Sequence, residues 1–164
     1  MNVFDILKKN TKENPKKIAL VLNEKEYSYE EFFKKLKNSI KILKQNKISN
    51  KSVVLVIEDN TLSHILTLFA LSYLNACVVP ASTYYSYDHL KKLIKISKVD
   101  SLIGNSKSFL FFKNTKNIKK IISTDKVNKF SYFFKKAKSK INLKNVKIDT
   151  KKNFIISLSS GSTG

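Results

Sequence analysis

The clearest candidates for chemistry are six small residues in a row, at positions 159–164. They are Ser159, Ser160, Gly161, Ser162, Thr163 and Gly164. Glycines let backbone N–H groups turn toward a ligand and approach it closely, and the hydroxyl groups can donate hydrogen bonds to phosphate oxygens. A concave group of such donors suits a polyphosphate. The string therefore predicts a phosphate-binding loop, although composition by itself leaves a flexible tail equally open.

The same string argues against a more familiar nucleotide-binding motif. A Walker A loop places Gly-Lys-Ser/Thr after four spacer residues, and no such sequence occurs in the chain. We therefore do not expect an ordinary P-loop NTPase. What the loop does has to be judged from the elements that position it.

An apolar stretch at residues 154–158 leads directly into this loop and predicts a strand. Upstream, the five consecutive apolar residues at 53–57 predict a strand covered on both faces, as in a parallel sheet. Helices and strands alternate between these two segments. We expect a helix at 61–74, a strand at 77–79, a helix that begins after Ser86, and strands at 101–103 and 121–122.

The first part of the chain predicts a helix at 3–14, ended by Pro15, and a hairpin of strands 18–22 and 26–28. Ser28 then begins a longer helix, because Glu31 three residues later completes a capping box. An apolar stripe follows at helical spacing on this lysine-rich helix. It consists of Phe32, Leu36, Ile40 and Leu43.

Alternating strands and helices predict an α/β fold of βαβ units, with a largely parallel sheet flanked by helices. In such sheets, ligands bind at the carboxyl ends of the strands, which is where residues 159–164 would lie. We treat residues 1–164 as one unit. The lysine-rich stretches at 106–120 and 127–147 are poorly periodic and are expected to be variable surface structure.

The histidines and the cysteine do not form a site in the sequence. We expect His64, in an apolar helix, to be packed and hydrogen-bonded, and His89, in a lysine-rich helix, to be exposed. Neither has neighbours with metal-ligand spacing. Cys77 lies in a predicted strand and is expected to be an inert packing thiol. A single cysteine also excludes an internal disulfide, which fits the cytoplasm.

Two groups of aromatic residues have both a structural and a functional interpretation. Tyr84, Tyr85 and Tyr87 could line a cleft or simply pack in a loop, so we do not assign them to the site. Residues 130–134 are flanked by lysines and could stack on nucleic-acid bases. We favour a short amphipathic helix for this segment.

The formal net charge of +20 suggests a binding module for nucleic acid or an anionic surface, and we keep this as the alternative function. However, all 32 basic residues are lysine, whereas arginine is the preferred residue for reading phosphate and guanine. The lysines are also scattered along the chain. A membrane span is not expected either, because the apolar stretch at 62–79 contains polar residues and ends at Pro80.

The order of these features resembles the adenylate-forming, or AMP-binding, superfamily, which includes acyl-CoA synthetases and peptide-synthetase adenylation domains. Residues 159–164 match the phosphate-loop motif of that family, S/T-S-G-S/T-T-G. Looser similarities to the conserved segments before that motif occur at residues 18–31, 52–60, 69–80 and 84–90. Asn75 stands where the family usually has glycine.

The resemblance implies that this chain is the N-terminal portion of an AMP-binding domain. In that family, the carboxylate of a substrate attacks the α-phosphate of Mg²⁺-bound ATP, giving an acyl-adenylate and pyrophosphate. The acyl group usually passes next to coenzyme A or to the phosphopantetheine of a carrier protein. The loop at 159–164 would hold the β- and γ-phosphates, whose developing negative charge its donors stabilise.

The resemblance also implies that residues needed for catalysis are missing. The family motif continues through Pro to Lys, and the adenine- and ribose-binding segments and a C-terminal domain follow. We therefore assign no catalytic residue here and no metal ligand. We expect the chain alone to be inactive. Three alternatives stay open: a gene fragment, a frameshifted or split gene, and an N-terminal subunit that a second chain completes. Fatty, aryl and amino acids remain equal alternatives as substrate.

Overall fold

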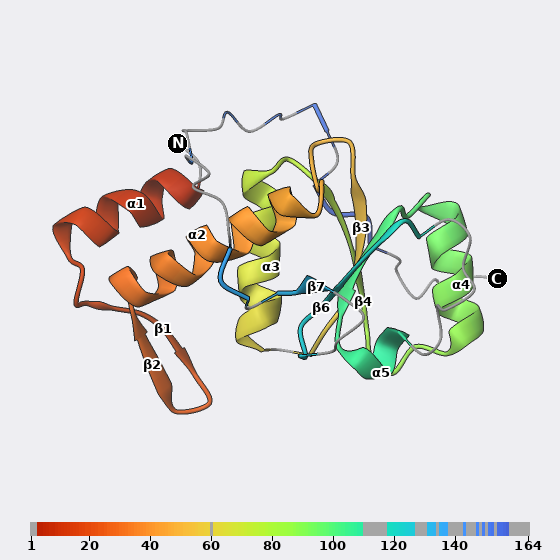
Figure 1. Ribbon diagram of the computed structural model, residues 1–164, viewed down its shortest axis with the longest axis horizontal. Helices are drawn as coiled ribbons and strands as arrows, with labels where there is room; N and C mark the ends of the chain where they lie inside the picture. The colour runs from red at the N-terminus through yellow and green to blue at the C-terminus, as the bar shows by residue number, and fades with distance from the viewer. Residues whose placement is uncertain are drawn as a thin grey trace.

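The structure is a computed structural model of the chain (Figure 1). It describes residues 3–59, 61–109, 118–126, 131–133, 135–137, 143, 147, 149, 151–152 and 154–157. None of the helices in these ranges has the length and apolar character needed to cross a membrane.

The first part of the chain folds as the sequence predicts. Helix α1 (Val3–Glu13) is followed by an antiparallel hairpin of β1 (Ile18–Leu22) and β2 (Lys25–Ser28). Asn23 and Glu24 connect the strands, and both have positive φ, 47° and 62°. Two consecutive positive φ values are those of a type I′ turn, whose twist matches that of the paired strands.

Helix α2 (Tyr29–Gln45) begins at the predicted capping box. The Glu31 N–H donates to the Ser28 hydroxyl (3.2 Å), and the Ser28 N–H donates to the Glu31 carboxylate (3.1 Å). The predicted apolar stripe is also confirmed, because all four side chains are buried. They are Phe32, Leu36, Ile40 and Leu43.

A parallel sheet of five strands forms the rest of the described structure, in the order β4-β3-β5-β6-β7. The strands are β3 (Val53–Ile57), β4 (Cys77–Ala81), β5 (Ser101–Gly104), β6 (Lys120–Ser123) and β7 (Ser131–Tyr132). The helices are α3 (Leu62–Tyr73), α4 (Tyr87–Ile96) and the short α5 (Ser106–Phe109). The predicted α/β class is thus confirmed.

Strand β3 is covered on both faces, as its unbroken apolar sequence predicts. Val54 and Val56 belong to the core formed with α1, α2 and α3, whereas Leu55 and Ile57 belong to the core formed with α4. Figure 1 shows these helices on opposite sides of the strands. The reason is topological. The chain moves from β3 to β4 in one direction and from β4 to β5 in the other, so crossovers of the same hand place α3 and α4 on opposite faces.

Gly104, at the end of β5, allows a close approach to β3. A Cβ at this position would lie 2.7 Å from the carbonyl oxygen of Ile57. Any larger residue would force the two strands apart. Gly104 therefore determines how closely β3 and β5 approach each other at the carboxyl edge of the sheet.

Three predictions for local structure need correction. Strand β4 continues through Pro80 to Ala81, two residues beyond the predicted strand at 77–79. The predicted amphipathic helix at 130–134 is wrong: Ser131–Tyr132 forms strand β7 beside β6. The periodicity of so short a segment cannot separate the two structures, and pairing with β6 decides the outcome.

The lysine-rich stretches are also not purely surface structure. Phe133 is fully buried, and Leu143 packs against the main core. Phe133 therefore offers no ring for stacking on bases. Residues 110–117, 127–130, 134, 138–142 and 144–146 of these stretches lie outside the described residues.

Candidate functional site

The carboxyl edge of the parallel sheet is where a ligand site is expected. The six predicted phosphate-binding residues, 159–164, lie outside the described residues. The described chain reaches Ser157, two residues before them. The geometry of the site therefore concerns what surrounds this point.

The segment 154–157 lies along the outer edge of β4. Ile155 forms a parallel bridge with Val78. The Val78 N–H donates to the Phe154 carbonyl (2.7 Å), and the Ile156 N–H donates to the Val78 carbonyl (2.8 Å). Because the pairing is parallel, the segment runs toward the carboxyl end of β4. The sequence predicted a strand at 154–158, and this single bridge confirms its position over residues 154–156.

Pro80 removes the next ladder donor beside this segment. In a parallel ladder, alternate residues of one strand bond to the same neighbour, so the next donor after Val78 on this side would be residue 80. Proline has no N–H, so position 80 offers no donor to the carbonyl of Ile156. The pairing with β4 lacks this hydrogen bond as the chain approaches Ser157 and the predicted loop.

A pocket of about 260 Å³ opens at this point. It lies between the end of β4, helix α4 and the segment that carries Ser157. Its lining residues are Pro80, Ala81, Ser82, Tyr85, Leu93 and Ser157. The pocket thus lies between the end of β4 and Ser157, two positions before the Ser/Gly loop begins.

Tyr85 is a residue that sequence reasoning missed. It lines the pocket, and its ring packs on His89 with centroids 4.4 Å apart. Tyr84, by contrast, is 94% exposed. The available signal was an aromatic residue shortly after a strand end. That signal does not separate Tyr85 from Tyr84 or Tyr87, because only the course of the loop decides which ring turns inward.

Glu58, directly after β3, forms a second polar centre at this edge. Its carboxylate accepts hydrogen bonds from the hydroxyls of Thr61 (2.9 Å) and Ser63 (2.7 Å) at the beginning of α3. It also accepts one from Thr124, which follows β6. These contacts fasten three elements together at the sheet edge. Acidic residues suit the N-terminus of a helix, but nothing in the local sequence predicted the contact with Thr124.

The adjacent Asp59 extends this acidic centre toward β4. Its carboxylate accepts a hydrogen bond from the hydroxyl of Thr83, in the loop after β4 (2.8 Å). Like charges repel, so an anionic ligand is expected away from Glu58 and Asp59.

The surroundings of His64, His89 and Cys77 fit structural roles. His89 is exposed, as predicted. The hydrogen bond expected for His64 is not found at Nδ1, which is buried and has no partner among the described residues. Burial raises the pKa of the Cys77 thiol, which fits a packing role. The described residues contain no group of three or more His, Cys, Asp and Glu side chains that could hold a metal ion.

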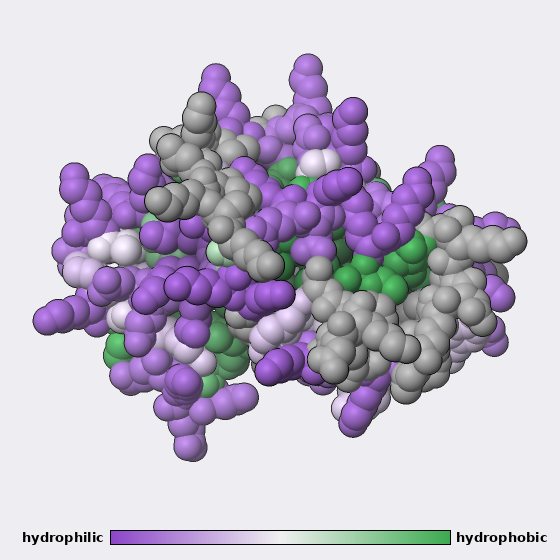
Figure 2. All heavy atoms as spheres, viewed as in Figure 1, coloured by the Kyte–Doolittle hydropathy of each residue, from purple (hydrophilic) through white to green (hydrophobic). Residues whose placement is uncertain are grey.

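Lysines gather at a different place, on the exposed face of α2. They line a groove of about 790 Å³ between α2 and residues 136–137. The lysines of the groove are Lys34, Lys35, Lys37, Lys41 and Lys136. Figure 2 shows that hydrophilic residues cover much of the visible face, so the groove is one part of a wider polar coat. It is one place at which the alternative function, binding of an anionic partner, could act.

Comparison with known proteins gives one family. The family model for the AMP-binding enzyme matches residues 7–164. No curated protein matches the chain. Solved structures do match it, although with low sequence identity.

The apo structure of MbtA from Mycobacterium smegmatis matches with a TM-score of 0.81 and 15% identity, over 100% of this chain and 32% of that one. A putative long-chain-fatty-acid CoA ligase from Rhodopseudomonas palustris matches with a TM-score of 0.70 and 12% identity, over 81% and 35%. Coronafacic acid ligase from Pectobacterium brasiliense matches with a TM-score of 0.69 and 23% identity, over 82% and 28%. The chain thus spans about a third of the length of these proteins.

Proposed function

We propose a function from the premise that the chain belongs to the AMP-binding enzyme family. Its fold is that of the N-terminal part of adenylate-forming enzymes. We propose that it supplies the ATP-phosphate-binding portion of an enzyme that activates a carboxylic acid. A carboxylate oxygen of the acid would attack the α-phosphorus of ATP. The bond between the α-phosphorus and the bridging oxygen would break, and pyrophosphate would leave with the electron pair.

One observation carries this proposal. The Ser-Ser-Gly-Ser-Thr-Gly string follows directly after a segment that pairs in parallel with β4 and runs to the carboxyl edge of the sheet. We propose that Ser159, Ser160, Gly161, Ser162, Thr163 and Gly164 hold the β- and γ-phosphates of ATP. Backbone N–H groups and hydroxyls would stabilise the negative charge that grows on pyrophosphate as it leaves.

We place the other groups of the reaction outside the described residues. Mg²⁺ would arrive bound to ATP, since the described residues hold no cluster suited to a metal. Coenzyme A, or the phosphopantetheine of an acyl or peptidyl carrier protein, would be the acceptor thiol. The name of one structural relative, a CoA ligase, supports the first of these. Because the reaction consumes ATP, we place it in the cytoplasm.

We further propose that these 164 residues need additional protein, in the same or a second chain, to catalyse adenylation. The support is length, because the chain covers only 32% of the relative that it matches over its whole length. ATP–pyrophosphate exchange, measured with a panel of fatty, aryl and amino acids, tests the proposal. We expect ATP binding without carboxylate-dependent exchange. Robust exchange by the chain alone would contradict the need for more protein, and failure to bind ATP would contradict the proposed loop.

The alternative, a lysine-rich module for nucleic acid or an anionic surface, is tested in parallel. The lysine groove on α2 favours it, but the buried Phe133 offers no stacking surface. Binding of duplex DNA should be measured between about 50 and 200 mM salt, with and without ATP. Tight binding that falls steeply with salt and does not respond to ATP would favour this alternative.

A further inference from the structure

The segment that leads to the Ser/Gly loop has one apolar side chain packed on a core. Ile156 is half-buried and packs against the core beside α4, whereas Phe154 is 39% exposed and Ile155 is 50% exposed, and a single bridge joins Ile155 to β4. In a sheet, register is well specified only where one face of the strand is buried, and one half-buried side chain is a weak constraint. A polar contact that holds the chain before this segment would add to it.

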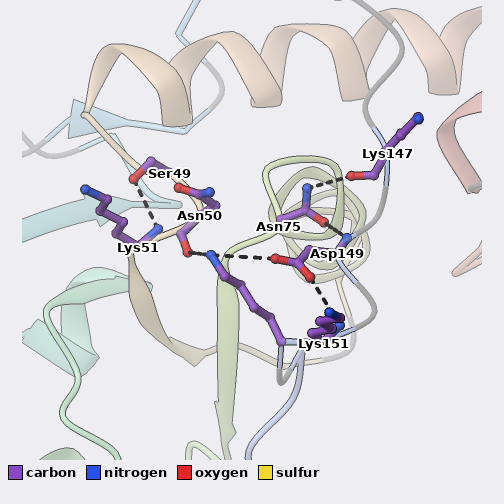
Figure 3. A network of polar contacts seen from close by, with 8 residues as sticks. Ser49, Asn50, Lys51, Asn75, Lys147, Asp149 and Lys151 are labelled. Atoms are coloured by element: carbon purple, nitrogen blue, oxygen red, sulfur yellow. Dashed lines mark hydrogen bonds and ion pairs between the residues drawn. The ribbon is translucent and has the colours of Figure 1, made fainter.

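The structure shows such a contact three residues before Val78. The side-chain amide of Asn75 donates to the carbonyl of Lys147 (3.1 Å), and its oxygen accepts from the N–H of Asp149 (3.1 Å). Figure 3 shows Asn75 pointing from the end of α3 toward these two residues. One donor and one acceptor exchanged with residues two apart is the pattern that a backbone residue makes in a parallel ladder. The Asn75 side chain thus makes the pair of hydrogen bonds that one more residue of a neighbouring strand would make.

Asp149 and Lys152 make further contacts that hold this part of the chain. The Asp149 carboxylate accepts from the Lys151 N–H (3.1 Å) and lies 3.8 Å from the Lys152 ammonium. That ammonium donates to the carbonyl of Asn50, just before β3 (3.3 Å). The chain is therefore held at the amino edge of the sheet at two points. Only five positions separate Asp149 from Phe154, so holding the first restricts where the second can pair.

The backbone explains why asparagine is accepted at position 75. Asn75 has φ 51° and follows the C-cap Leu74 of α3. The N–H of Asn75 donates to Ser72, and that of Ala76 donates to Leu71 (3.0 and 3.1 Å), which is a Schellman motif. Glycine and asparagine are the residues that take this conformation at low cost. Glycine, however, would preserve the turn and lose the two contacts with Lys147 and Asp149.

We infer that Asn75 is a positioning residue, which sets the register of the segment 154–157 on β4 and thereby the point from which residues 159–164 depart. The inference rests on the proposed function only for the role of those six residues. Asn75 would contact no reacting group itself and would act through the segment 154–157.

A second asparagine provides a matched control. Asn38, in α2, makes the same pair of contacts with another part of the chain: its amide donates to the Lys135 carbonyl (2.9 Å), and its oxygen accepts from the Ala137 N–H (3.0 Å). Asn38→Ala removes a contact of equal type that does not touch the segment beside β4.

Amide hydrogen exchange of Asn75→Gly, followed by NMR, tests the inference in this chain. Ile156 and Val78 donate across the bridge, so their amides are expected to exchange about tenfold faster than in the unmodified chain once two hydrogen bonds are lost. Amides of β3 and the urea midpoint are expected to stay unchanged, because glycine keeps the turn. Asn75→Asp retains the acceptor but loses the donor, so its exchange rates should lie between those of the unmodified chain and those of Asn75→Gly.

Three results would overturn the inference. They are unchanged exchange at Ile156 in Asn75→Gly, equally faster exchange in Asn38→Ala, and a fall of the urea midpoint that accounts for the whole change. ATP titration separates this inference from the proposed function. If the unmodified chain binds ATP, Asn75→Gly should bind it several-fold more weakly, and equal affinity would contradict the positioning of the loop. If the unmodified chain does not bind ATP, the proposed function fails, and the exchange data alone decide the role of Asn75.

Discussion

The centre and the outer edge of the parallel sheet are held by different forces. In the centre, Val54 and Leu55 of β3 are completely buried, one against α1–α3 and the other against α4. At the outer edge, Phe154 and Ile155 are 39% and 50% exposed, and two backbone hydrogen bonds join Phe154 and Ile156 to Val78. The centre is thus stabilised by apolar burial, which scales with area and does not depend on direction. The edge depends on a few directional contacts and on the half-buried Ile156.

This difference separates the scaffold from the proposed site. Burial makes the scaffold robust, because many side chains share the stabilisation. The segment before residues 159–164 is held by a few contacts, and we expect that each can be removed without unfolding the chain. The predictions below compare the two regions, beginning with the largest expected effect.

Truncation of a central and an edge side chain should differ most. Leu55→Ala leaves a cavity in the core beside α4 and is expected to lower the free energy of unfolding by about 2–5 kcal/mol. Ile155→Ala removes a half-exposed side chain, and the expected loss is below about 1 kcal/mol. Urea unfolding followed by circular dichroism measures both. Equal losses would show that the edge is buried as deeply as the centre.

Overpacking at the centre of the sheet is expected to cause the next largest loss in the free energy of unfolding. In Gly104→Ala, the new Cβ meets the carbonyl oxygen of Ile57 at 2.7 Å, so β3 and β5 must move apart. We expect a loss of about 1–3 kcal/mol in the free energy of unfolding, measured by the same urea titration. An unchanged midpoint would mean that this end of β5 moves freely and that the centre is less rigid than its burial indicates.

A local polar contact should cost less than either change in the core. Ser28→Ala removes the hydroxyl that caps α2 and is expected to cost about 1 kcal/mol. Ser28→Thr keeps a capping oxygen and serves as the control. The comparison with Asn75→Gly is informative, because the cap acts within one turn of its own helix, whereas Asn75 acts on a segment more than seventy residues away. A loss in Ser28→Thr as large as in Ser28→Ala would contradict the capping role.

The smallest perturbation uses the native thiol as a probe of the edge. Cys77 precedes Val78 in β4, and burial raises the pKa of its thiol. Less thiolate is then present at pH 8 than for an exposed cysteine. We expect labelling at least about tenfold slower in the folded chain than in urea, and faster as the pH rises. Equal rates in the folded and unfolded chains would show that this edge of the sheet opens freely.

Much of the fold could be predicted from local pattern. The unbroken apolar residues of β3 predicted a strand covered on both faces, and Ser28 with Glu31 predicted the beginning of α2. Both predictions rest on interactions within a few residues, or on a period that one element sets by itself. The segment 130–134 was predicted wrongly as a helix for the same reason. A strand as short as β7 has no clear period, and its state depends on whether β6 lies beside it.

The sequence by itself determined the order of the strands and helices from α1 to β6, apart from the short α5, and the chemistry available at residues 159–164. Only the tertiary structure decided which distant residues meet at the sheet edges. Thr124 reaches Glu58 across 66 positions, and the Asp149 N–H reaches Asn75 across 74. Such contacts follow from the path of the chain, which no local period encodes. For Asn75, the turn follows from its place at the end of a helix, whereas its hold on the segment beside β4 exists only after that segment has returned to the sheet.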